Sequence, residues 1–240
     1  MAFNHGNNHR KGIGKGIVAD ESLVFLVDPQ SDASWHKPGI SSTFKDVSGL
    51  GNHGTINGAP TYDVGDGGMT LDGSNDYIVH GDDASIDLTT AASYCMWIKP
   101  GGGGNYRPFC RDDGGTHRNW WFYMYGAGGL PGTMWFSVMS GGSNKAINHA
   151  SSYNTDAWYY YVGTYSTLSG TILYRNGSNV GANSFTGDAD NDDVSLGVGA
   201  YANGSHKFNG MIGTFSIYNK KLSAAEVLRN YNAQKARFGL

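Results

Sequence analysis

Apolar residues occur in short runs along this chain, and turn-forming residues separate the runs. Leu23–Val27 is apolar throughout. Within Ser93–Lys99, residues 94–98 are all apolar, so a strand formed there would be apolar on both faces. Apolar residues on both faces are expected for a strand buried inside a sandwich. Further strand-like runs are Met69–Gly73, Asn119–Tyr125, Met134–Met139, Ala157–Tyr165, Thr171–Tyr174, Val194–Val198 and Met211–Tyr218. The pattern predicts an all-β protein of many short strands.

One helix is predicted near the end of the chain. Ser223-Ala-Ala-Glu226 has the form of a capping box, in which the serine hydroxyl and the glutamate carboxylate satisfy free backbone amides. Leu222 and Val227 are placed as a hydrophobic staple, and Val227, Leu228 and Tyr231 give one apolar stripe. We expect this helix to be a structural cap on the sheets.

Composition fits a single large β domain. The chain has 240 residues, of which 37 are glycine, and charged residues make up only 15%. Many glycines and aromatic residues are typical of short strands joined by tight turns.

No apolar stretch approaches the roughly 20 residues of a membrane span, and the first residues lack the apolar core of a signal peptide. We therefore expect synthesis in the cytoplasm without export by the usual signal. Cys95 and Cys110 are expected to be free buried thiols.

Residues 1–20 differ from the rest of the chain. They are rich in Gly, Asn and His, carry Arg10, Lys11 and Lys15, and contain no acid before Asp20. We predict an extended anchoring arm that docks on another chain, with a strand or loop folded back on its own domain as the alternative. The remaining residues are net acidic, which argues against nucleic acid as the main target.

Six segments together resemble the laminin-G-like, concanavalin A-like jelly-roll family. They are Asp46–Thr55, Gly58–Tyr62, Leu71–Ile78, Tyr94–Pro100, Trp158–Gly177 and Phe208–Ala233, and the resemblance spans residues 22–238. The resemblance implies a two-sheet antiparallel jelly-roll sandwich over residues 21–240, with one short C-terminal helix and residues 1–20 as a separate arm. This fold carries lectins, glycosidases and structural modules, so the fold alone does not decide the function.

Catalysis is not expected. Glycosidases use a pair of carboxylates beside the scissile bond, and the family's version is a strand with two glutamates. This chain has only Glu21 and Glu226, at the start of the first predicted strand and in the helix cap. We therefore predict a protein that is not an enzyme.

Calcium is the one cofactor that the sequence suggests. The family often holds a structural calcium near its opening loop, which implies Asp46 as a ligand. Asp188, Asp190 and Asp192 form an acidic run that resembles the start of a calcium loop. The alternative for this run is a solvated acidic turn.

Sugar binding would require an aromatic platform with polar neighbours. Trp120, Trp121 and Trp135 are the candidates, with Asn119 and Asn148 nearby in the sequence. Because neighbouring residues on a strand face opposite ways, one of Trp120 and Trp121 should point outward. The alternative is that these rings fill the core of the sandwich.

Two functions remain. Leu23–Trp35 and Phe44–Gly49 resemble the opening of laminin-G-like proteins common among bacteriophage virion proteins. We therefore expect a virion structural protein, a capsid decoration or an appendage, made in the host cytoplasm and present in many copies or as a homo-oligomer. Its partners would be other virion proteins, bound through residues 1–20, and glycans, without a membrane. The alternative is a carbohydrate-binding lectin module of a cellular protein.

Overall fold

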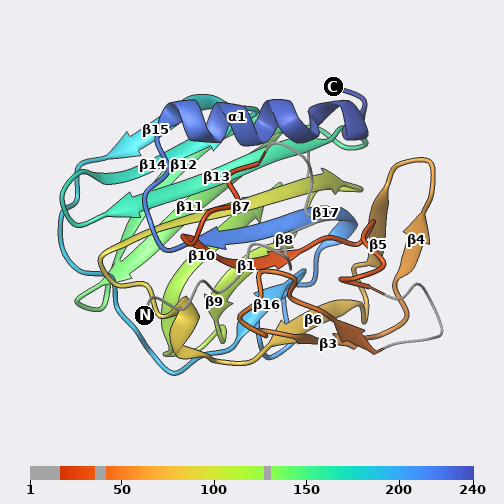
Figure 1. The fold of residues 1–240 in the computed structure, drawn as a ribbon, viewed down its shortest axis with the longest axis horizontal. Coiled ribbons are helices and arrows are strands. Elements are labelled where there is room, and N and C mark those ends of the chain that lie inside the picture. Colours follow the sequence, from red (N-terminus) through yellow and green to blue (C-terminus); the bar gives the residue numbers. More distant parts are fainter. Residues whose placement is uncertain (1–16, 36–41, 127–130) are drawn as a thin grey trace, which may run out of the picture.

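The computed structural model describes residues 17–35, 42–126 and 131–240, which form two antiparallel sheets packed face to face (Figure 1). Within these residues the first sheet has eight strands in the order β15-β14-β13-β7-β17-β5-β4, with β1 also paired to β17. The second has nine strands in the order β12-β11-β10-β9-β16-β6-β3-β2, with β8 also paired to β10. The predicted all-β, two-sheet jelly roll is confirmed.

The strands of the first sheet are β1 (Leu23–Val27), β4 (Thr61–Asp63), β5 (Gly68–Asp72), β7 (Ala91–Pro100), β13 (Tyr159–Ser166), β14 (Gly170–Arg175), β15 (Ser178–Asn183) and β17 (Asn209–Tyr218). Those of the second are β2 (Thr43–Phe44), β3 (Gly54–Asn57), β6 (Tyr77–His80), β8 (Asn105–Tyr106), β9 (Phe109–Asp112), β10 (Arg118–Tyr125), β11 (Gly132–Ser140), β12 (Ser143–Tyr153) and β16 (Leu196–Val198). The helical elements are η1 (Ala84–Ile86), α1 (Ala224–Gln234) and η2 (Lys235–Phe238).

Aromatic side chains fill the space between the sheets. Tyr94 on β7 stacks on Trp120 of β10 with ring centroids 3.9 Å apart, and Phe109 meets Phe215 edge to face at 4.9 Å. Strand β7 is buried on both sides, since Tyr94 faces this core while Trp97 belongs to a second apolar cluster outside the sheet. The apolar pattern of Ser93–Lys99 therefore marks a central strand, as predicted.

Helix α1 and η2 cover the outer side of the first sheet, which we call the helix-side sheet (Figure 1). The predicted capping box is present, with Ser223 and Glu226 each bound to the other's backbone amide. Phe238 of η2 stacks on Trp97 with centroids 4.3 Å apart. Leu228 is 46% exposed, so the predicted apolar stripe is narrower than expected. The helix is a structural cap, as predicted.

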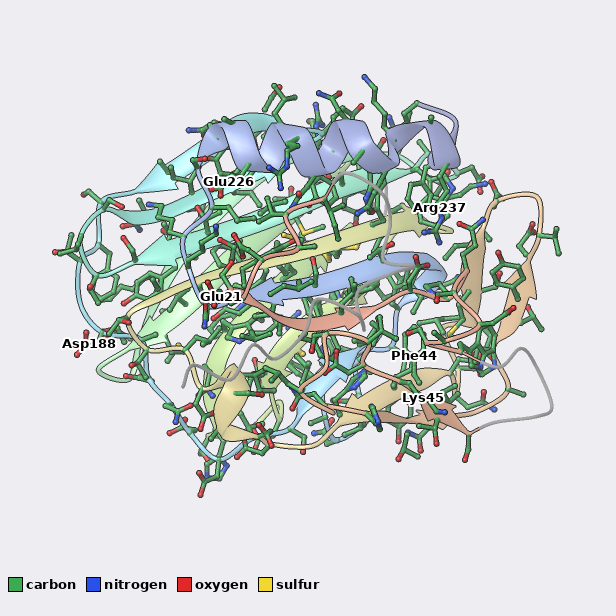
Figure 2. The ribbon with its side chains drawn as sticks, viewed as in Figure 1. Glu21, Phe44, Lys45, Asp188, Glu226 and Arg237 are labelled. Carbon is green, nitrogen blue, oxygen red and sulfur yellow. The ribbon has the colours of Figure 1, made fainter. Side chains whose placement is uncertain are left out.

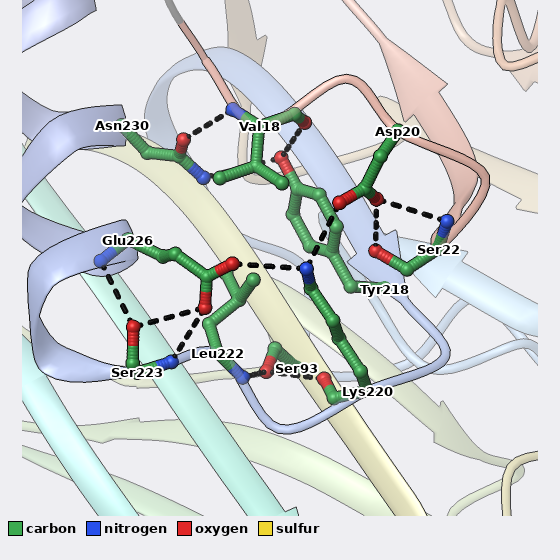
Figure 3. Close-up of polar contacts among 10 residues, drawn as sticks. All are labelled: Val18, Asp20, Ser22, Ser93, Tyr218, Lys220, Leu222, Ser223, Glu226 and Asn230. Carbon is green, nitrogen blue, oxygen red and sulfur yellow. Dashed lines mark hydrogen bonds and ion pairs between the residues drawn. The ribbon is translucent and has the colours of Figure 1, made fainter.

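Residues 17–20 fold onto the domain rather than belonging to a separate arm (Figure 3). Ile17 and Val18 are buried in the cluster beneath the helix. The Val18 amide donates to Asn230 Oδ1 at 2.7 Å, and the Tyr218 hydroxyl donates to the Val18 carbonyl at 2.9 Å. Asp20 pairs with Lys220 at 2.9 Å. The domain therefore begins before the predicted boundary at residue 20, because this short apolar segment completes the cluster.

The end of the chain is tied to the same side. Arg237 donates two hydrogen bonds to the Asp28 carboxylate, at 2.7 and 2.8 Å, so η2 is joined to the loop after β1 (Figure 2). Such a two-point contact fixes orientation as well as distance.

Both cysteines are free and buried. Cys95 lies in the cluster beneath the helix and Cys110 lies on the outer side of the second sheet. Burial raises the pKa of both thiols. The prediction of free buried thiols is confirmed.

Candidate functional site

The two outer faces of the sandwich differ in what covers them. On the helix-side sheet, the helical elements and residues 17–18 cover the cluster around Trp97. On the second sheet, a smaller cluster of Cys110, Trp121 and Tyr201 lies on the outer side, and the described helices contribute nothing to it. We call this second sheet the open sheet. Its outer face is the natural place to look for a binding surface.

Alternation along β10 decides which aromatic residues reach that face. Trp120, Phe122 and Met124 point into the core. Residues between them point outward, since successive side chains of a strand face opposite sides. The outer aromatic face consists of Trp121, Tyr123, Tyr125, Trp135 and Tyr201.

Tyr123, Tyr125 and Trp135 are the accessible rings of this face. Tyr123 lies directly opposite Trp135 in the β10–β11 ladder, with ring centroids 6.5 Å apart, and Tyr125 follows at 6.1 Å from Tyr123. Trp135 is half-buried, and Tyr125 is 43% exposed. On the next strand, the exposed Asn148 is the direct partner of Trp135. Accessible aromatic rings beside an amide side chain can hold an apolar ring face and the hydroxyls around it.

A cation lies between two rings of the same face. The guanidinium carbon of Arg107 is 3.8 Å from the ring centroid of Tyr123 and 4.7 Å from that of Tyr201. The Arg107 amide donates to the His206 carbonyl at 3.0 Å, which fixes the backbone at this point. Tyr123 also donates its hydroxyl to Asn105 Oδ1 at 3.3 Å. The arginine is therefore held in place by stacking on aromatic rings.

An ion pair between Arg118 and Asp112 borders the cluster of Cys110, Trp121 and Tyr201. The Arg118 Nε lies 3.6 Å from Oδ1 of Asp112, which is 1% exposed and accepts a hydrogen bond from the Gly114 amide at 2.7 Å. Burial raises the pKa of Asp112 despite this bond and the two nearby arginines. Arg118 thus has an acidic partner of its own, whereas no carboxylate among the described residues forms an ion pair with Arg107.

The structure separates the three tryptophans proposed for sugar binding. Trp120 is 2% exposed and stacks in the core, so its proposed role is corrected: the ring cannot reach a ligand. Trp121 points outward, as was predicted for one of the two neighbouring tryptophans. Its side chain is only 6% exposed. Trp135 is the tryptophan of the three that combines an outward direction with an accessible ring. Asn119 is buried and bound to Asp192.

Asp46 does not have the surroundings of a calcium ligand. Its Oδ1 accepts from the Leu26 and Ser48 amides at 3.0 and 2.8 Å. Its Oδ2 accepts from the Ser48 hydroxyl and the Asn52 amide at 2.8 and 3.0 Å. Hydrogen-bond donors therefore surround both oxygens, whereas a calcium site presents oxygen acceptors. Asp46 instead ties its own loop to β1.

Asp188, Asp190 and Asp192, the predicted calcium ligands of the 188–193 loop, do not converge. Asp190 accepts from the Gly141 and Gly142 amides at 2.7 and 2.9 Å, which caps the β11–β12 hairpin. Asp192 accepts from the Arg118 amide at 2.9 Å, and Asp188 is exposed on the loop (Figure 2). Among the described residues no group of three or more His, Cys, Asp or Glu could hold a metal ion. The residues present do not fit the calcium that the family resemblance implied.

The remaining predicted residues lie elsewhere. Arg10, Lys11 and Lys15 are outside the described residues. Glu21 is exposed before β1, while the Glu226 carboxylate is bound to Ser223 and Lys220, so the two glutamates serve different elements (Figure 2). Within the described residues, no helix is long and apolar enough to cross a membrane.

Sequence reasoning missed Arg107, Tyr123 and Tyr201. The alternation that placed one tryptophan outward also places Tyr123 and Tyr125 on its face, so this signal was available. Arg107 and Tyr201 come from segments outside the predicted strands. Nothing in their local sequence indicates that they meet over Tyr123.

Solved structures share this architecture. The binding domain of botulinum neurotoxin serotype G matches with a TM-score of 0.69 and 15% identity over 89% of this chain and 51% of that chain. The binding domain of botulinum neurotoxin DC in complex with SialylT matches with a TM-score of 0.66 and 14% identity over 90% of this chain and 52% of that chain. The same binding domain in complex with rat synaptotagmin II matches with a TM-score of 0.65 and 12% identity over 88% of this chain and 51% of that chain. The chain thus spans about half the length of these domains, and the likeness shows the fold.

Sequence comparison assigns the family. No match was found among curated proteins. The sequence profile of the concanavalin A-like lectin/glucanases superfamily, in its laminin G form, matches residues 72–228, which is more than half of the chain. The match covers β6 to β17 and includes β10 and β11, the strands of the outer aromatic face. This chain therefore belongs to the concanavalin A-like lectin/glucanase superfamily.

Proposed function

We propose that this lectin-like jelly roll is a carbohydrate-binding domain that holds a saccharide on the outer aromatic face of the open sheet. The observation that carries the proposal is Trp135, an accessible ring paired with Tyr123 and lying opposite the exposed Asn148. Aromatic rings pack against the apolar face of a sugar, and amide side chains bind its hydroxyls.

The comparisons support the class of function. Members of the superfamily include lectins, and a structural neighbour was solved in complex with SialylT. Another structure of that neighbour's domain contains rat synaptotagmin II, so a protein ligand is the competing possibility for a fold of this kind. A protein interface of standard size would bury about 800 Å² per partner, whereas a saccharide needs only the few rings described above.

Replacing Trp135 with alanine should weaken saccharide binding about tenfold or more, since the variant removes the largest accessible ring of the outer aromatic face. A glycan array with the full chain identifies a bound saccharide, and isothermal titration calorimetry then measures Kd for both proteins. Leu168→Ala is a matched control, because Leu168 is 91% exposed on the other sheet. Equal binding by wild type and Trp135→Ala would contradict the proposal.

A second proposal concerns the setting of the domain. The hypothesis of a virion surface protein attached through residues 1–20 is kept as a prediction, since its anchoring residues Arg10, Lys11 and Lys15 lie outside the described residues. The position of residues 17–20 supports one part of this proposal, the place where such an arm would leave the domain. That place lies beside α1, on the sheet opposite the outer aromatic face. Co-purification of the chain with particles, lost on deletion of residues 1–15, would test it. Retention of the truncated chain on particles would refute it.

A further inference from the structure

We propose that Arg107 makes the outer aromatic face selective for acidic saccharides, by binding the carboxylate of a uronic or sialic acid unit. This inference rests on the proposed function, because it names the class of sugar that the same face would take. It begins from an imbalance: the cation at the centre of the face is held in place, but no carboxylate among the described residues forms an ion pair with it.

The position of Arg107 is set by rings rather than by acids. Its guanidinium carbon lies 3.8 Å from the Tyr123 ring centroid and 4.7 Å from that of Tyr201. Its one side-chain hydrogen bond among the described residues is a long contact from Nη1 to the Tyr106 carbonyl, at 3.4 Å. Its Nε is buried without a hydrogen-bond partner. Stacking thus orients the guanidinium group while leaving donor capacity unused.

Two other arginines of this protein, Arg111 and Arg237, show which partners a guanidinium group finds here. Arg111 donates to two aspartates and two backbone carbonyls. Arg237 binds both oxygens of the Asp28 carboxylate, although its Nε, like that of Arg107, is buried without a partner among the described residues. Arg107 has no such carboxylate in the described part of the chain. A ligand carboxylate would supply the planar, two-oxygen partner that the guanidinium fork prefers.

The surrounding charges leave the site positive. Arg118 lies beside Asp112, so these two charges largely offset each other. The ring centroids of His206 and Tyr201 are 5.1 Å apart, and burial and the nearby Arg107 lower the pKa of His206, which favours the neutral ring. Arg107 also lies near the buried Asp112 carboxylate but forms no ion pair with it, so two arginines share this one buried carboxylate, although the chain as a whole has a net charge of −3. Local charge thus favours an anion where the overall charge would not.

Trp135 and Arg107 are close enough to contact one ligand at the same time. Tyr123 is the shared neighbour: Arg107 stacks on it, and Trp135 is its direct cross-strand partner at 6.5 Å between centroids. A sugar ring on Trp135 would therefore place a carboxylate substituent, or that of the adjoining sugar unit, toward Arg107. Aromatic stacking and a charge-assisted hydrogen bond would act on the same molecule.

The test compares acidic and neutral sugars that otherwise match. Sialyllactose with lactose, and a glucuronic-acid disaccharide with its glucose counterpart, are titrated into the full chain by isothermal titration calorimetry. We expect each acidic sugar to bind at least about tenfold more tightly than its neutral counterpart. A larger affinity ratio for sialyllactose over lactose indicates a sialic acid ligand, and a larger ratio for the glucuronic-acid pair indicates a uronic acid ligand.

Arg107→Gln should abolish the preference, so that the affinities for the acidic and the neutral sugar agree within about twofold, because the charge-assisted contact is removed. Arg107→Lys should retain part of the preference, since lysine keeps the charge but loses the fork. Lys145→Gln is the control, because Lys145 also lies over a ring, that of Phe185 at 5.0 Å, but on β12 away from this face.

Each outcome decides between the two proposals. Equal binding of acidic and neutral sugars by the wild type overturns the acidic preference while the carbohydrate-binding function stands. An unchanged preference in a folded Arg107→Gln, with only a lower thermal midpoint, shows that Arg107 merely supports the two tyrosines and also overturns it. Binding of neither sugar class at millimolar concentration overturns both the preference and the proposed function.

Discussion

Replacing Arg111 with methionine should lower the free energy of unfolding by about 3–5 kcal/mol, because the change removes a buried cation that is bound by two carboxylates and two backbone carbonyls. Arg111 is 1% exposed and points to the core side of β9. It forms ion pairs with Asp82 and with Asp87, the latter at 2.7 Å. It also donates to the carbonyls of Ile86 and Val194 at 3.0 and 3.1 Å.

Urea unfolding followed by tryptophan fluorescence measures this loss. Arg229→Met is the control, since Arg229 is exposed on α1 and its loss should change stability by no more than about 0.5 kcal/mol. Adding Asp82→Asn and Asp87→Asn to Arg111→Met should recover part of the stability, because the unpaired charges are then removed. A loss below about 1 kcal/mol for Arg111→Met would mean that the network does not hold η1 to the open sheet.

Acidification should destabilise the fold through His80. Burial lowers the pKa of His80 to about 4 from an ordinary value of 6.5. The Asn52 carbonyl accepts a hydrogen bond from Nδ1 at 2.8 Å, and the buried Nε2 has no partner among the described residues. A second proton on Nε2 would therefore be buried without an acceptor, which favours the neutral ring.

The sign of the effect follows from proton uptake. Below pH 6.5 the unfolded chain carries a proton on His80 that the folded chain does not, so unfolding takes up a proton and stability falls. The loss should grow as pH falls from 6.5 to 4 and reach about 3 kcal/mol at the lower end. Above pH 6.5 the residue is neutral in both states and contributes no pH dependence.

Two measurements check this expectation. The NMR titration of the His80 ring in the folded protein should give a pKa near 4, and His117 serves as the comparison, because its contact with Asp113 raises its pKa. Urea unfolding between pH 7 and pH 4 should show a steeper loss for wild type than for His80→Gln. A His80 pKa near 6.5, or parallel curves for the two proteins, would contradict the account.

Much of the fold could be predicted because local patterns and packing agree. Apolar residues on both faces of Ser93–Lys99 identified the central strand, and the Ser223–Glu226 capping box identified the helix. The D-x-S-G-x-G-N-H-G motif also has a physical basis in the structure. Asp46 accepts from three donors of its own loop and one of β1, and a Cβ at Gly54 would lie 2.5 Å from the His80 ring.

The boundary of the domain could not be predicted in the same way. Residues 17–20 look like a continuation of the glycine-rich leader in sequence. Their place is set by contacts with Tyr218 and Asn230, some 200 residues later in the chain. Likewise, the aspartates that resembled a calcium loop are separated because Asp190 binds an amide of the β11–β12 turn, whereas Asp192 binds an amide of β10.

The candidate site was predictable only in part. Alternation along β10 distinguishes Trp121, Tyr123 and Tyr125 from Trp120. It does not reveal that the helix covers one sheet and leaves the other open, because this depends on how the layers pack. The stacking of Arg107 between Tyr123 and Tyr201 joins segments almost a hundred residues apart. Such a contact leaves no periodic signal in the sequence.

The most direct test of carbohydrate binding on the open sheet uses the six tryptophans as reporters. The indole nitrogens of Trp35, Trp97, Trp120 and Trp158 are buried without partners, whereas Trp121 and Trp135 belong to the outer aromatic face. A two-dimensional NMR titration with a bound saccharide should shift the Trp135 indole signal most and the Trp121 signal less, leaving the other four in place. Shifts at Trp97 or Trp158 instead would place the sugar beneath the helix and contradict the account.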